Sequence, residues 1–230
     1  MNVNSAPEGY LLVDKPAGMT SFSVVAALRK KLKVQKIGHG GTLDPFATGL
    51  LIVLVGRVYT KQADRFLEDS KEYLATLHLG SATDSYDIDG KVTSTSDLIP
   101  TEEEIQSVLQ QFQGIIEQIP PMFSAKKIRG KRLYELARAG KEVERKSSKV
   151  EVNIQLLHYA YPEVQLLISC SKGTYVRSLG HEIGLQLGSF AFVSQLRRTR
   201  SGSFQISNSL PLQTILDQST PVICHKFDEI

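Results

Sequence analysis

The sequence predicts an α+β fold, and three observations point to this class. Strand-like and helix-like segments follow one another without the regular alternation of a doubly wound parallel sheet. The 230 residues, 41% hydrophobic and 22% charged, have the composition of a globular protein and suffice for a full core. The sequence holds neither an internal repeat nor a low-complexity linker. We therefore expect a single domain over residues 1–230.

The first third of the chain predicts three strands and two helices. Residues 10–13 are an apolar run, predicted to be a short buried strand that ends at a turn over 15–18. Thr20 or Ser21 can cap the helix that follows. Apolar residues recur in this helix near helical spacing: Phe22, Val25, Leu28 and Leu32. A buried strand, a helix and a half-buried strand are expected next, over 50–55, 57–67 and 72–79.

Caps and alternation predict the remaining elements. After a polar loop over 81–90, Thr101 and Glu104 form a capping box for a helix that ends near Phe112. Gly140 and Gly188 mark the ends of two further helices. These helices are expected over 131–139 and 174–187, and further strands over 150–157, 164–171, 193–196 and 202–206.

Composition excludes several classes of protein. The longest apolar run, 50–55, is far too short to span a bilayer, so no membrane segment is expected. The N-terminal residues lack the basic and apolar regions of a signal peptide. Cys170 and Cys224 show neither metal-ligand spacing nor a disulfide framework. We expect a reduced cytoplasmic protein without a metal site, with Cys170 as an inert part of the core.

The most informative segment is residues 38–51, with the sequence GHGGTLDPFATGLL. It places one carboxylate, that of Asp44, and four glycines in a loop before an apolar strand. Glycine lets the backbone approach a ligand closely, and Pro45 fixes one dihedral directly after the acid. Such a loop can hold one carboxylate in one direction, as a nucleophile or a general base requires.

The same residues admit other interpretations. Asp before Pro and paired glycines are common in turns, so composition alone leaves a purely structural loop equally open. A phosphate-binding loop is disfavoured, because the sequence has neither the P-loop pattern with its Lys and Ser/Thr nor G-x-G-x-x-G.

Positive charge gathers in one segment of the chain. Residues 126–149 hold ten Lys or Arg and three acids, a net +7, whereas the other residues hold 17 basic and 21 acidic side chains, a net −4. Tyr134 is interleaved among the basic residues. This distribution favours an RNA contact over a solvated helix face.

Several segments resemble the signature motifs of the tRNA pseudouridine-55 synthase family, the TruB/dyskerin family of pseudouridine synthases. They are residues 38–51, 14–21 (DKPAGMTS) and 170–179 (CSKGTYVRSL), in the family's order. KEY at 71–73 and IPPMFSA at 119–125 lie between them. The resemblance runs from about Gly9 to Gly202. It implies a mixed, largely antiparallel sheet with flanking helices and a central catalytic cleft.

The resemblance also implies a reaction, the isomerisation of uridine to pseudouridine at position 55 in the T arm of tRNA. The target base leaves its stack, and no cofactor is expected because the product is an isomer of the substrate. Asp44 matches the family's nucleophile, which attacks C1′ of the ribose or C6 of the base. Arg177 matches the arginine that pairs with this carboxylate. Tyr73 matches the catalytic tyrosine that stacks on the uracil and can take the sugar proton.

Further residues match positions that bind the substrate: His39, Tyr73, Tyr175 and Leu196. Without the resemblance they would be interpreted as ordinary structural residues: His39 as a hydrogen-bonding histidine, Tyr73 as a half-buried strand residue, and Tyr175 and Leu196 as core. The family's insertion that grips the RNA corresponds to about residues 120–149. Its predicted RNA-binding residues are Lys126, Lys127, Arg129, Lys131 and Arg132.

Three other basic residues, Arg197, Arg198 and Arg200, are predicted to contact the RNA backbone. Lys15 could equally face phosphate or cap a turn. About two dozen residues follow Ile206, so no complete C-terminal RNA-binding domain is expected. A monomer is the family's ordinary state.

Other functions stay open. The chain could be a non-catalytic module that binds or folds tRNA, although Asp44, Tyr73 and Arg177 argue against a pure binder. It could be a hydrolase that uses Asp44 to release free uracil. It could also be a pseudouridine synthase with another RNA target.

Overall fold

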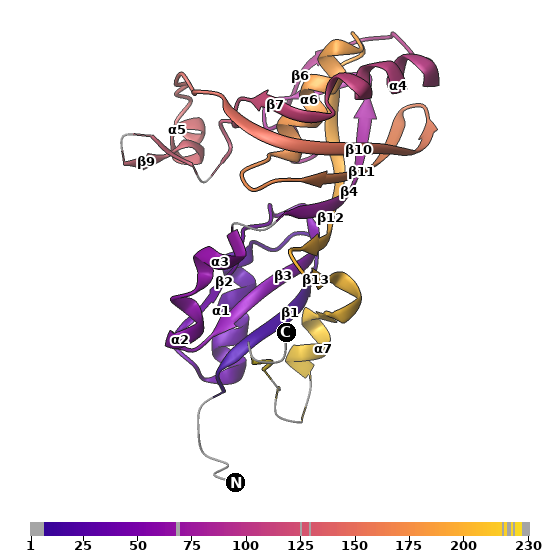
Figure 1. The fold of residues 1–230 in the computed structure, drawn as a ribbon. Coiled ribbons are helices and arrows are strands. Elements are labelled where there is room, and N and C mark those ends of the chain that lie inside the picture. Colours follow the sequence, from indigo (N-terminus) through magenta and orange to yellow (C-terminus); the bar gives the residue numbers. More distant parts are fainter. Residues whose placement is uncertain are drawn as a thin grey trace. The chain divides into compact units, whose positions relative to one another are not determined.

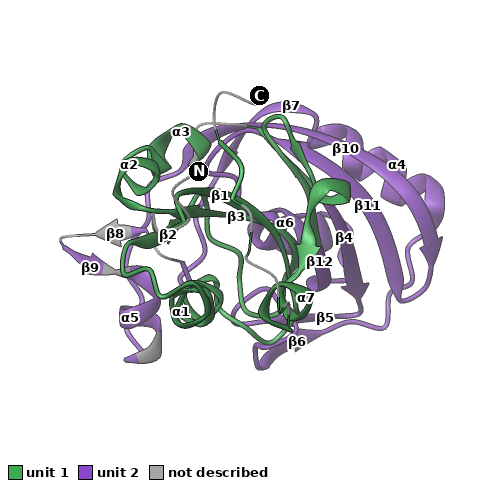
Figure 2. Cartoon of the chain, turned by 90° about the horizontal axis from the view of Figure 1, so that it is seen from below, with its two compact units in different colours: residues 1–72, 197–230 green, residues 73–196 purple. Residues whose placement is uncertain are grey.

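The computed structural model describes residues 7–67, 70–124, 126–128, 130–217, 219, 222 and 224–226. The chain forms two compact units, which Figure 2 shows in different colours. Unit 1 comprises residues 1–72 and 197–230, and unit 2 comprises residues 73–196. The boundaries fall inside two strands, β4 (Lys71–Leu79) and β12 (Ala191–Ser201).

Unit 1 is built on sheet strands in the order β14-β1-β3-β12. β1 (Gly9–Lys15) and β3 (Thr48–Val55) run antiparallel, side by side (Figure 1). β2 (Ile37–His39) pairs antiparallel with β3, and β13 (Phe204–Gln205) pairs antiparallel with β12. β14 (Leu210–Pro211) joins β1 in parallel, and β12 joins β3 in parallel.

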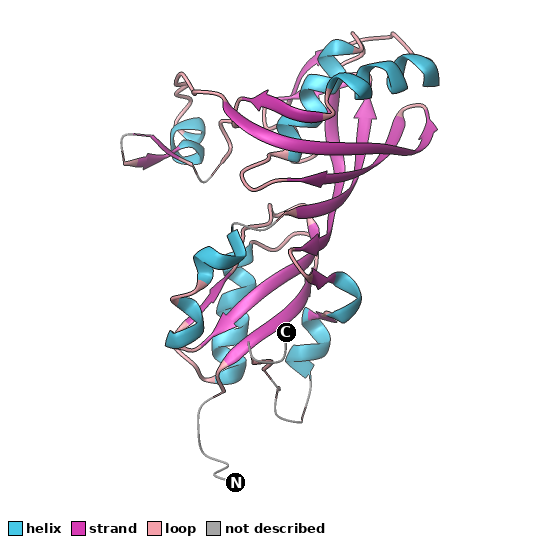
Figure 3. Ribbon diagram, viewed as in Figure 1, coloured by secondary structure: helices cyan, strands magenta, loops and turns pink. Residues whose placement is uncertain are grey.

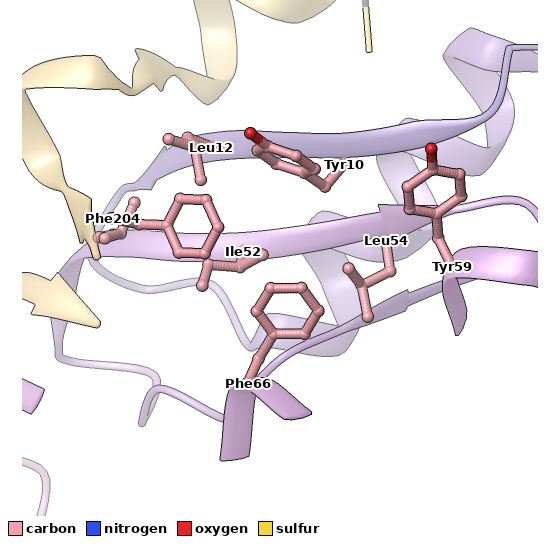
Figure 4. Close-up of a cluster of buried hydrophobic side chains, with 8 residues drawn as sticks. Tyr10, Leu12, Ile52, Leu54, Tyr59, Phe66 and Phe204 are labelled. Atoms are coloured by element: carbon pink, nitrogen blue, oxygen red, sulfur yellow. The ribbon is translucent and has the colours of Figure 1, made fainter. Parts of the chain in front are cut away.

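β3 is buried along nearly its whole length, which indicates that both faces of this sheet are covered. α2 (Arg57–Thr60) and α3 (Ala63–Leu67) cover one face. α1 (Ser21–Leu32) and α7 (Leu212–Asp217) contact one another on the other face (Figure 2), and the short 3-10 helix η1 (Ile206–Asn208) follows β13. Figure 4 shows the core under α2 and α3, which is formed by Tyr10, Leu12, Leu50, Ile52, Leu54, Tyr59, Phe66 and Phe204.

Unit 2 holds sheet strands in the order β12-β4-β11-β10-β7. β10 (Ser148–Ala160) pairs antiparallel with β11 (Glu163–Cys170) and with β7 (Gly114–Gln118). α4 (Glu102–Gln111) packs against β10 and α6 (Val176–Gln186), as Figure 3 shows. Two hairpins and one short helix complete the unit: β5 (Ser81–Thr83) with β6 (Val92–Thr95), β8 (Lys127–Ile128) with β9 (Lys131–Arg132), and α5 (Leu133–Arg138).

The predicted fold class is confirmed, since strands and helices are mixed and most strand pairs are antiparallel. The capping box is also confirmed: Thr101 Oγ1 accepts from Glu104 N, and Glu104 Oε2 accepts from Thr101 N. Gly140 and Gly188 both adopt left-handed φ angles, of 67° and 68°. In the part of the chain that the structure describes, no helix is long and apolar enough to cross a membrane.

The predicted helix over 57–67 is wrong in one respect, because it divides into α2 and α3. Gln62 N donates to the carbonyl of Tyr59, and Arg65 N donates to that of Gln62. These bonds reach back three residues instead of four, which tightens the turn and ends α2. The two short helices still direct Tyr59 and Phe66 into the core.

The predicted buried face of α1 is partly wrong. Val25 and Leu28 are buried as expected, but Phe22 is 66% exposed. Thr20 caps the helix, its Oγ1 accepting from Ser23 N, so that Ser21 begins the first turn. Val24 completes the buried stripe with Val25 and Leu28, and Phe22 lies outside this stripe.

Several boundaries also differ from the prediction. Lys131 and Arg132 belong to β9 and not to α5, because they pair with β8. The expected loop over 81–90 begins as the strand β5. The run predicted over 193–196 is part of the longer β12. β2 and β7 were not expected, since each is short and lacks a clear period-two pattern.

Candidate active site

Asp44 lies in the loop of unit 1 that joins β2 to β3, and it is half-buried. Its neighbours Leu43 and Ala47 are buried, at 3% and 0% exposure, so they anchor the loop on both sides of the acid. Ala47 N donates to the Asp44 carbonyl across a tight turn at 3.2 Å. Gly41 has a φ of +120°, which an L side chain rarely adopts, so the sequence needs glycine there.

The segment before α1 holds this loop through paired hydrogen bonds. Ser21 Oγ accepts from Leu43 N at 2.9 Å and donates to the Leu43 carbonyl at 3.1 Å. Gly18 N donates to the Pro45 carbonyl at 2.8 Å. The residues on either side of Asp44 are therefore fixed to one segment, which limits the directions that the carboxylate can take.

Lys15 is fully buried and caps a turn, so the structure decides between the two roles expected for it. Its Nζ donates to the carbonyls of Pro16 at 2.9 Å, Met19 at 2.6 Å and Pro45 at 3.3 Å. Burial lowers the pKa of Lys15 from 10.5 to about 8, while the Asp44 carboxylate raises it and Arg198 lowers it. The charge of Lys15 therefore acts on Asp44 from within the fold.

Arg198 also holds the loop, and the expected contact of this residue with RNA is wrong. It is 1% exposed, and its Nε donates to the Leu50 carbonyl at 2.7 Å. One terminal nitrogen of its guanidinium lies 3.3 Å from the Gly41 carbonyl. A guanidinium enclosed in this way cannot reach a phosphate. It joins the two ends of the Asp44 loop instead.

The neighbours of Arg198 also have partners inside unit 1. Arg197 forms a bidentate pair with Asp14, at 2.6 Å and 3.1 Å. Arg200 Nε lies 4.0 Å from Glu72. These pairs support the sheet, and the prediction that they contact RNA stays a prediction.

His39 is the last residue of β2, before the Asp44 loop. Burial, followed by the charge of Arg198, lowers its pKa from 6.5. Its Nδ1 is buried and has no hydrogen-bond partner among the described residues. The imidazole is thus neutral at pH 7, which suits a binding role better than an ionic one.

In unit 2, Arg177 lies in the first turn of α6 and is 3% exposed. Its guanidinium donates to the carbonyls of Ser85 at 3.0 Å and Phe123 at 2.7 Å. Its Nε lies 3.6 Å from Asp87 Oδ2. The buried carboxylate of Asp87 also accepts from Ser85 Oγ and from Asp89 N. The arginine is therefore held at three points.

The sequence analysis did not single out Asp87. It lay among three aspartates of the predicted polar loop, and composition did not distinguish them. A backbone bridge joins Asp87 to Val193 of β12, where Ile88 N donates to the Val193 carbonyl.

The predicted pocket residues of unit 2 lie on three elements. Tyr73 lies on β4 and is half-buried, and Leu196 lies on β12 at 7% exposure. Tyr175 stands before α6 and exchanges two hydrogen bonds with the buried side chain of Gln118: Tyr175 N donates to Oε1 at 2.7 Å, and Nε2 donates to the Tyr175 carbonyl at 3.1 Å. These two bonds fix the backbone of the motif over 170–179 to the side chain of Gln118, the last residue of β7.

The predicted RNA-binding residues fall on the β8–β9 hairpin and its flanks. Lys126 and Lys131 are exposed. Lys127 and Arg132 are backbone partners in the hairpin, and Arg129 lies outside the described residues. A role in RNA binding stays a prediction for this group.

Each unit thus gathers part of the expected site. Unit 1 holds Asp44 and His39 with Lys15 and Arg198, and unit 2 holds Tyr73, Tyr175, Arg177 and Leu196. The first set offers a constrained carboxylate beside buried cations. The second offers a buried guanidinium and two tyrosines.

Comparison with known proteins assigns the whole arrangement to one family. Residues 29–176 match the model of the TruB family pseudouridylate synthase N-terminal domain, and residues 177–223 match that of the tRNA pseudouridylate synthase B C-terminal domain. The expectation that no complete C-terminal RNA-binding domain is present stays a prediction.

Curated relatives bear the name tRNA pseudouridine synthase B. The chain is 55% identical to the protein of Chlamydia pneumoniae over 203 residues, which cover 88% of this chain and 86% of the relative. It is 56% identical to that of Protochlamydia amoebophila, covering 88% and 78%. It is 46% identical to that of Clostridium kluyveri, covering 90% and 71%.

Two solved structures are also similar to this chain. A chain in the crystal structure of a Cbf5-Nop10-Gar1 complex is 34% identical, with a TM-score of 0.73, and the match covers 92% of this chain and 54% of that one. A chain of an H/ACA RNP bound to a substrate RNA containing 2′-deoxyuridine is 33% identical, with a TM-score of 0.67, covering 91% and 52%. This chain spans about half the length of those solved chains.

Proposed function

The chain belongs to the TruB family of pseudouridylate synthases, and from this premise we propose that it isomerises uridine 55 in the T arm of tRNA, with Asp44 as the nucleophile. The relatives named tRNA pseudouridine synthase B support the coarser statement, that the chain is an isomerase which forms pseudouridine in tRNA. The position in the T arm, the nucleophile and base flipping are the finer parts of the proposal.

One observation carries the assignment of Asp44: its loop is held by contacts from outside the loop on both sides of the acid. Ser21 binds Leu43, and Gly18 and Lys15 bind Pro45. A carboxylate kept in one direction, beside buried cations, is suited to attack carbon.

The reaction conserves every atom of the uridine. Asp44 attacks at C1′ of the ribose or at C6 of the base, the N1–C1′ bond breaks, and the uracil turns within the site. A bond then forms between C5 and C1′. In the C1′ route Asp44 is displaced from C1′ as this bond forms, and in the C6 route Asp44 is eliminated from C6 afterwards. The proton on C5 is removed, N1 gains a proton, and the Asp44 carboxylate is free again. Because nothing is oxidised or reduced, this chemistry requires no cofactor.

The residues of unit 2 have supporting roles in the proposal. Arg177 compensates the charge of the Asp44 carboxylate in the substrate complex, as the family resemblance implies. Tyr73 stacks on the flipped uracil, while His39, Tyr175 and Leu196 bind the displaced nucleotide. The segment around Lys126 and Lys131 binds the backbone of the T arm. We place this enzyme in the cytoplasm, as a monomer.

The test is incubation of the purified protein with an unmodified tRNA transcript, followed by nucleoside analysis of the T arm. We expect pseudouridine at position 55 with the wild type and none with Asp44→Asn. Asp64→Asn is the matched control, an exposed aspartate of the same unit, and it should keep full activity.

The other outcomes identify the rival functions. Free uracil would indicate a hydrolase. Unchanged uridine together with tight tRNA binding would indicate a binding module. Pseudouridine at another position would identify a sister enzyme with a different target.

A further inference from the structure

A second positively charged surface lies in unit 1, on and beside α1. Between residues 15 and 63 the chain carries eight Lys or Arg, and Asp44 is the only acid. The net charge of the whole chain, +3, conceals this segment because the acids lie elsewhere. Five of the eight cations belong to the last turns of α1 and the residues that follow: Arg29, Lys30, Lys31, Lys33 and Lys36.

One stripe of α1 combines these cations with an exposed aromatic ring. Phe22, Ala26 and Arg29 are spaced by four and three residues, so they share a side of the helix outside its buried stripe, and Lys33 follows as the C-cap residue. Phe22 is 66% exposed, and the Arg29 guanidinium carbon lies 5.8 Å from its ring centroid. An exposed ring beside a guanidinium is a platform on which an unstacked base can lie.

The stripe begins beside the Asp44 loop. Ser21, directly before Phe22, exchanges two hydrogen bonds with Leu43, directly before Asp44. The proposed nucleophile and the exposed ring are therefore each one residue away from the same pair of hydrogen bonds.

The other end of the stripe leads to α2. Gly56 N donates to the Lys36 carbonyl at 2.8 Å, which places Lys36 beside Arg57. Both side chains are exposed, as are those of Lys30 and Lys33. The cations thus continue from α1 to the start of α2 without an intervening acid.

We propose that five of these residues, Phe22, Lys30, Lys33, Lys36 and Arg57, form an RNA-binding surface for the strand that flanks the target uridine. We call it the α1 surface. The inference rests on the proposed function, which brings a single-stranded RNA segment to Asp44. Phe22 stacks on a base next to the target, and the cations neutralise the phosphates that follow. Arg29 is left out because it donates to the Ile37 carbonyl at 2.7 Å and so fixes α1 to β2.

The experiment measures binding of an unmodified tRNA transcript at several salt concentrations, with Asp44→Asn in every variant so that the RNA is not converted. Lys30→Gln with Lys36→Gln removes two charges. It should make the slope of log Kd against log salt shallower by about 1.4, since each phosphate contact on a single strand contributes about 0.7. Lys91→Gln is the control, an exposed lysine of unit 2, and it should leave the slope unchanged.

A second pair of variants tests stacking. Phe22→Ala should weaken binding about tenfold, the scale of one base stacked on an aromatic ring, whereas Phe22→Trp should retain it. Ile99→Ala is the control, because Ile99 is also an exposed apolar residue, at 62%, but lies in unit 2. Thermal melting shows whether each variant is folded. If Phe22→Ala melts at a lower temperature than the wild type, Phe22→Leu takes its place in the comparison with Phe22→Trp.

The outcomes separate this inference from the proposed function. An unchanged salt slope in the double variant, or equal binding by the Ala and Trp variants, would overturn the α1 surface even if the wild type forms pseudouridine. A wild type that forms none, while its binding still depends on Lys30 and Lys36, would overturn the proposed function and leave the surface standing. An absence of tRNA binding would overturn both.

Discussion

Lys15 Nζ lies 3.3 Å from the carbonyl oxygen of Pro45, the residue directly after Asp44. The same ammonium holds the carbonyls of Pro16 and Met19, so one buried cation joins the end of β1, the turn before α1 and the proposed catalytic loop. An ammonium with three fixed acceptors is well suited to this position, since its three donors are all used. The charge that caps the turn also lies within electrostatic reach of Asp44.

Replacing Lys15 by Met should therefore affect both stability and turnover. Met keeps an unbranched side chain but removes every donor, and leaving buried carbonyls with fewer partners costs about 1–3 kcal/mol. We expect a lower free energy of unfolding and a lower kcat, since the Asp44 loop loses a restraint. Denaturant unfolding and single-turnover kinetics measure the two effects. The exposed Lys91→Met is the control, and wild-type behaviour of Lys15→Met would contradict the role.

Asp87 should control the position of Arg177. Asp87→Asn keeps the shape of the side chain but removes the charge that faces Arg177 Nε at 3.6 Å. If Arg177 acts in the reaction, a small displacement should lower kcat by up to about 100-fold, the scale reported for misplacing a catalytic group by an ångström. Single-turnover rates with tRNA test this. Asp89→Asn changes an exposed acid of the same loop, and an equal loss in that variant would show that the effect is not specific to Asp87.

Local signals in the sequence predicted some elements well and others poorly. The capping box at Thr101, the helix ends at Gly140 and Gly188 and the apolar strand before Gly56 depend on nearby residues, so the sequence alone was enough to predict them. The division of 57–67 into two helices and the exposure of Phe22 depend on which side of the chain meets the sheet. That information is tertiary, and periodicity does not contain it.

The site shows the same division. Asp44 was predicted because glycines and a proline surround it, and the other pocket residues were predicted through the family resemblance. Arg198 was misassigned because a guanidinium buried among backbone carbonyls and one facing a phosphate have the same sequence signature. Asp87 was missed because its contacts with Arg177 and Val193 join residues that are far apart in the sequence.

The lowered pKa of His39 predicts a pH dependence of stability. Burial and Arg198 hold its pKa in the folded chain below the unfolded value of 6.5. The unfolded chain therefore binds a proton more readily, and stability should fall as the pH drops below about 6.5 towards the folded pKa. His39→Gln should reduce this loss between pH 7 and pH 5 in denaturant unfolding.

His181 has to be measured in the same series. Burial lowers its pKa as well, so it contributes to the loss in the same direction. His181→Gln isolates that part, and the double variant should show the flattest profile. A His39→Gln profile that matches the wild type would contradict the assignment.

Gly49, at the start of β3, should tolerate a side chain poorly. Its φ is +99°, and an added Cβ would lie 2.4 Å from the Arg198 carbonyl oxygen and 2.8 Å from Arg198 N. Both are backbone atoms of the paired strand β12, which cannot move without opening the sheet. Since Arg198 also binds the Asp44 loop, the strain would reach the proposed site.

Gly114→Ala supplies the matched comparison for Gly49→Ala. Gly114 has a similar φ of +78°, but nothing lies within 4 Å of an added Cβ. The free energy of unfolding of Gly114→Ala should fall by only about 1–2 kcal/mol, the cost of holding an L-residue in the left-handed conformation. Gly49→Ala adds a backbone clash, so its free energy of unfolding should fall by more than about 4 kcal/mol, a loss that few single substitutions cause. Denaturant unfolding of the two variants side by side measures the difference, and equal losses would mean that β12 yields at Arg198.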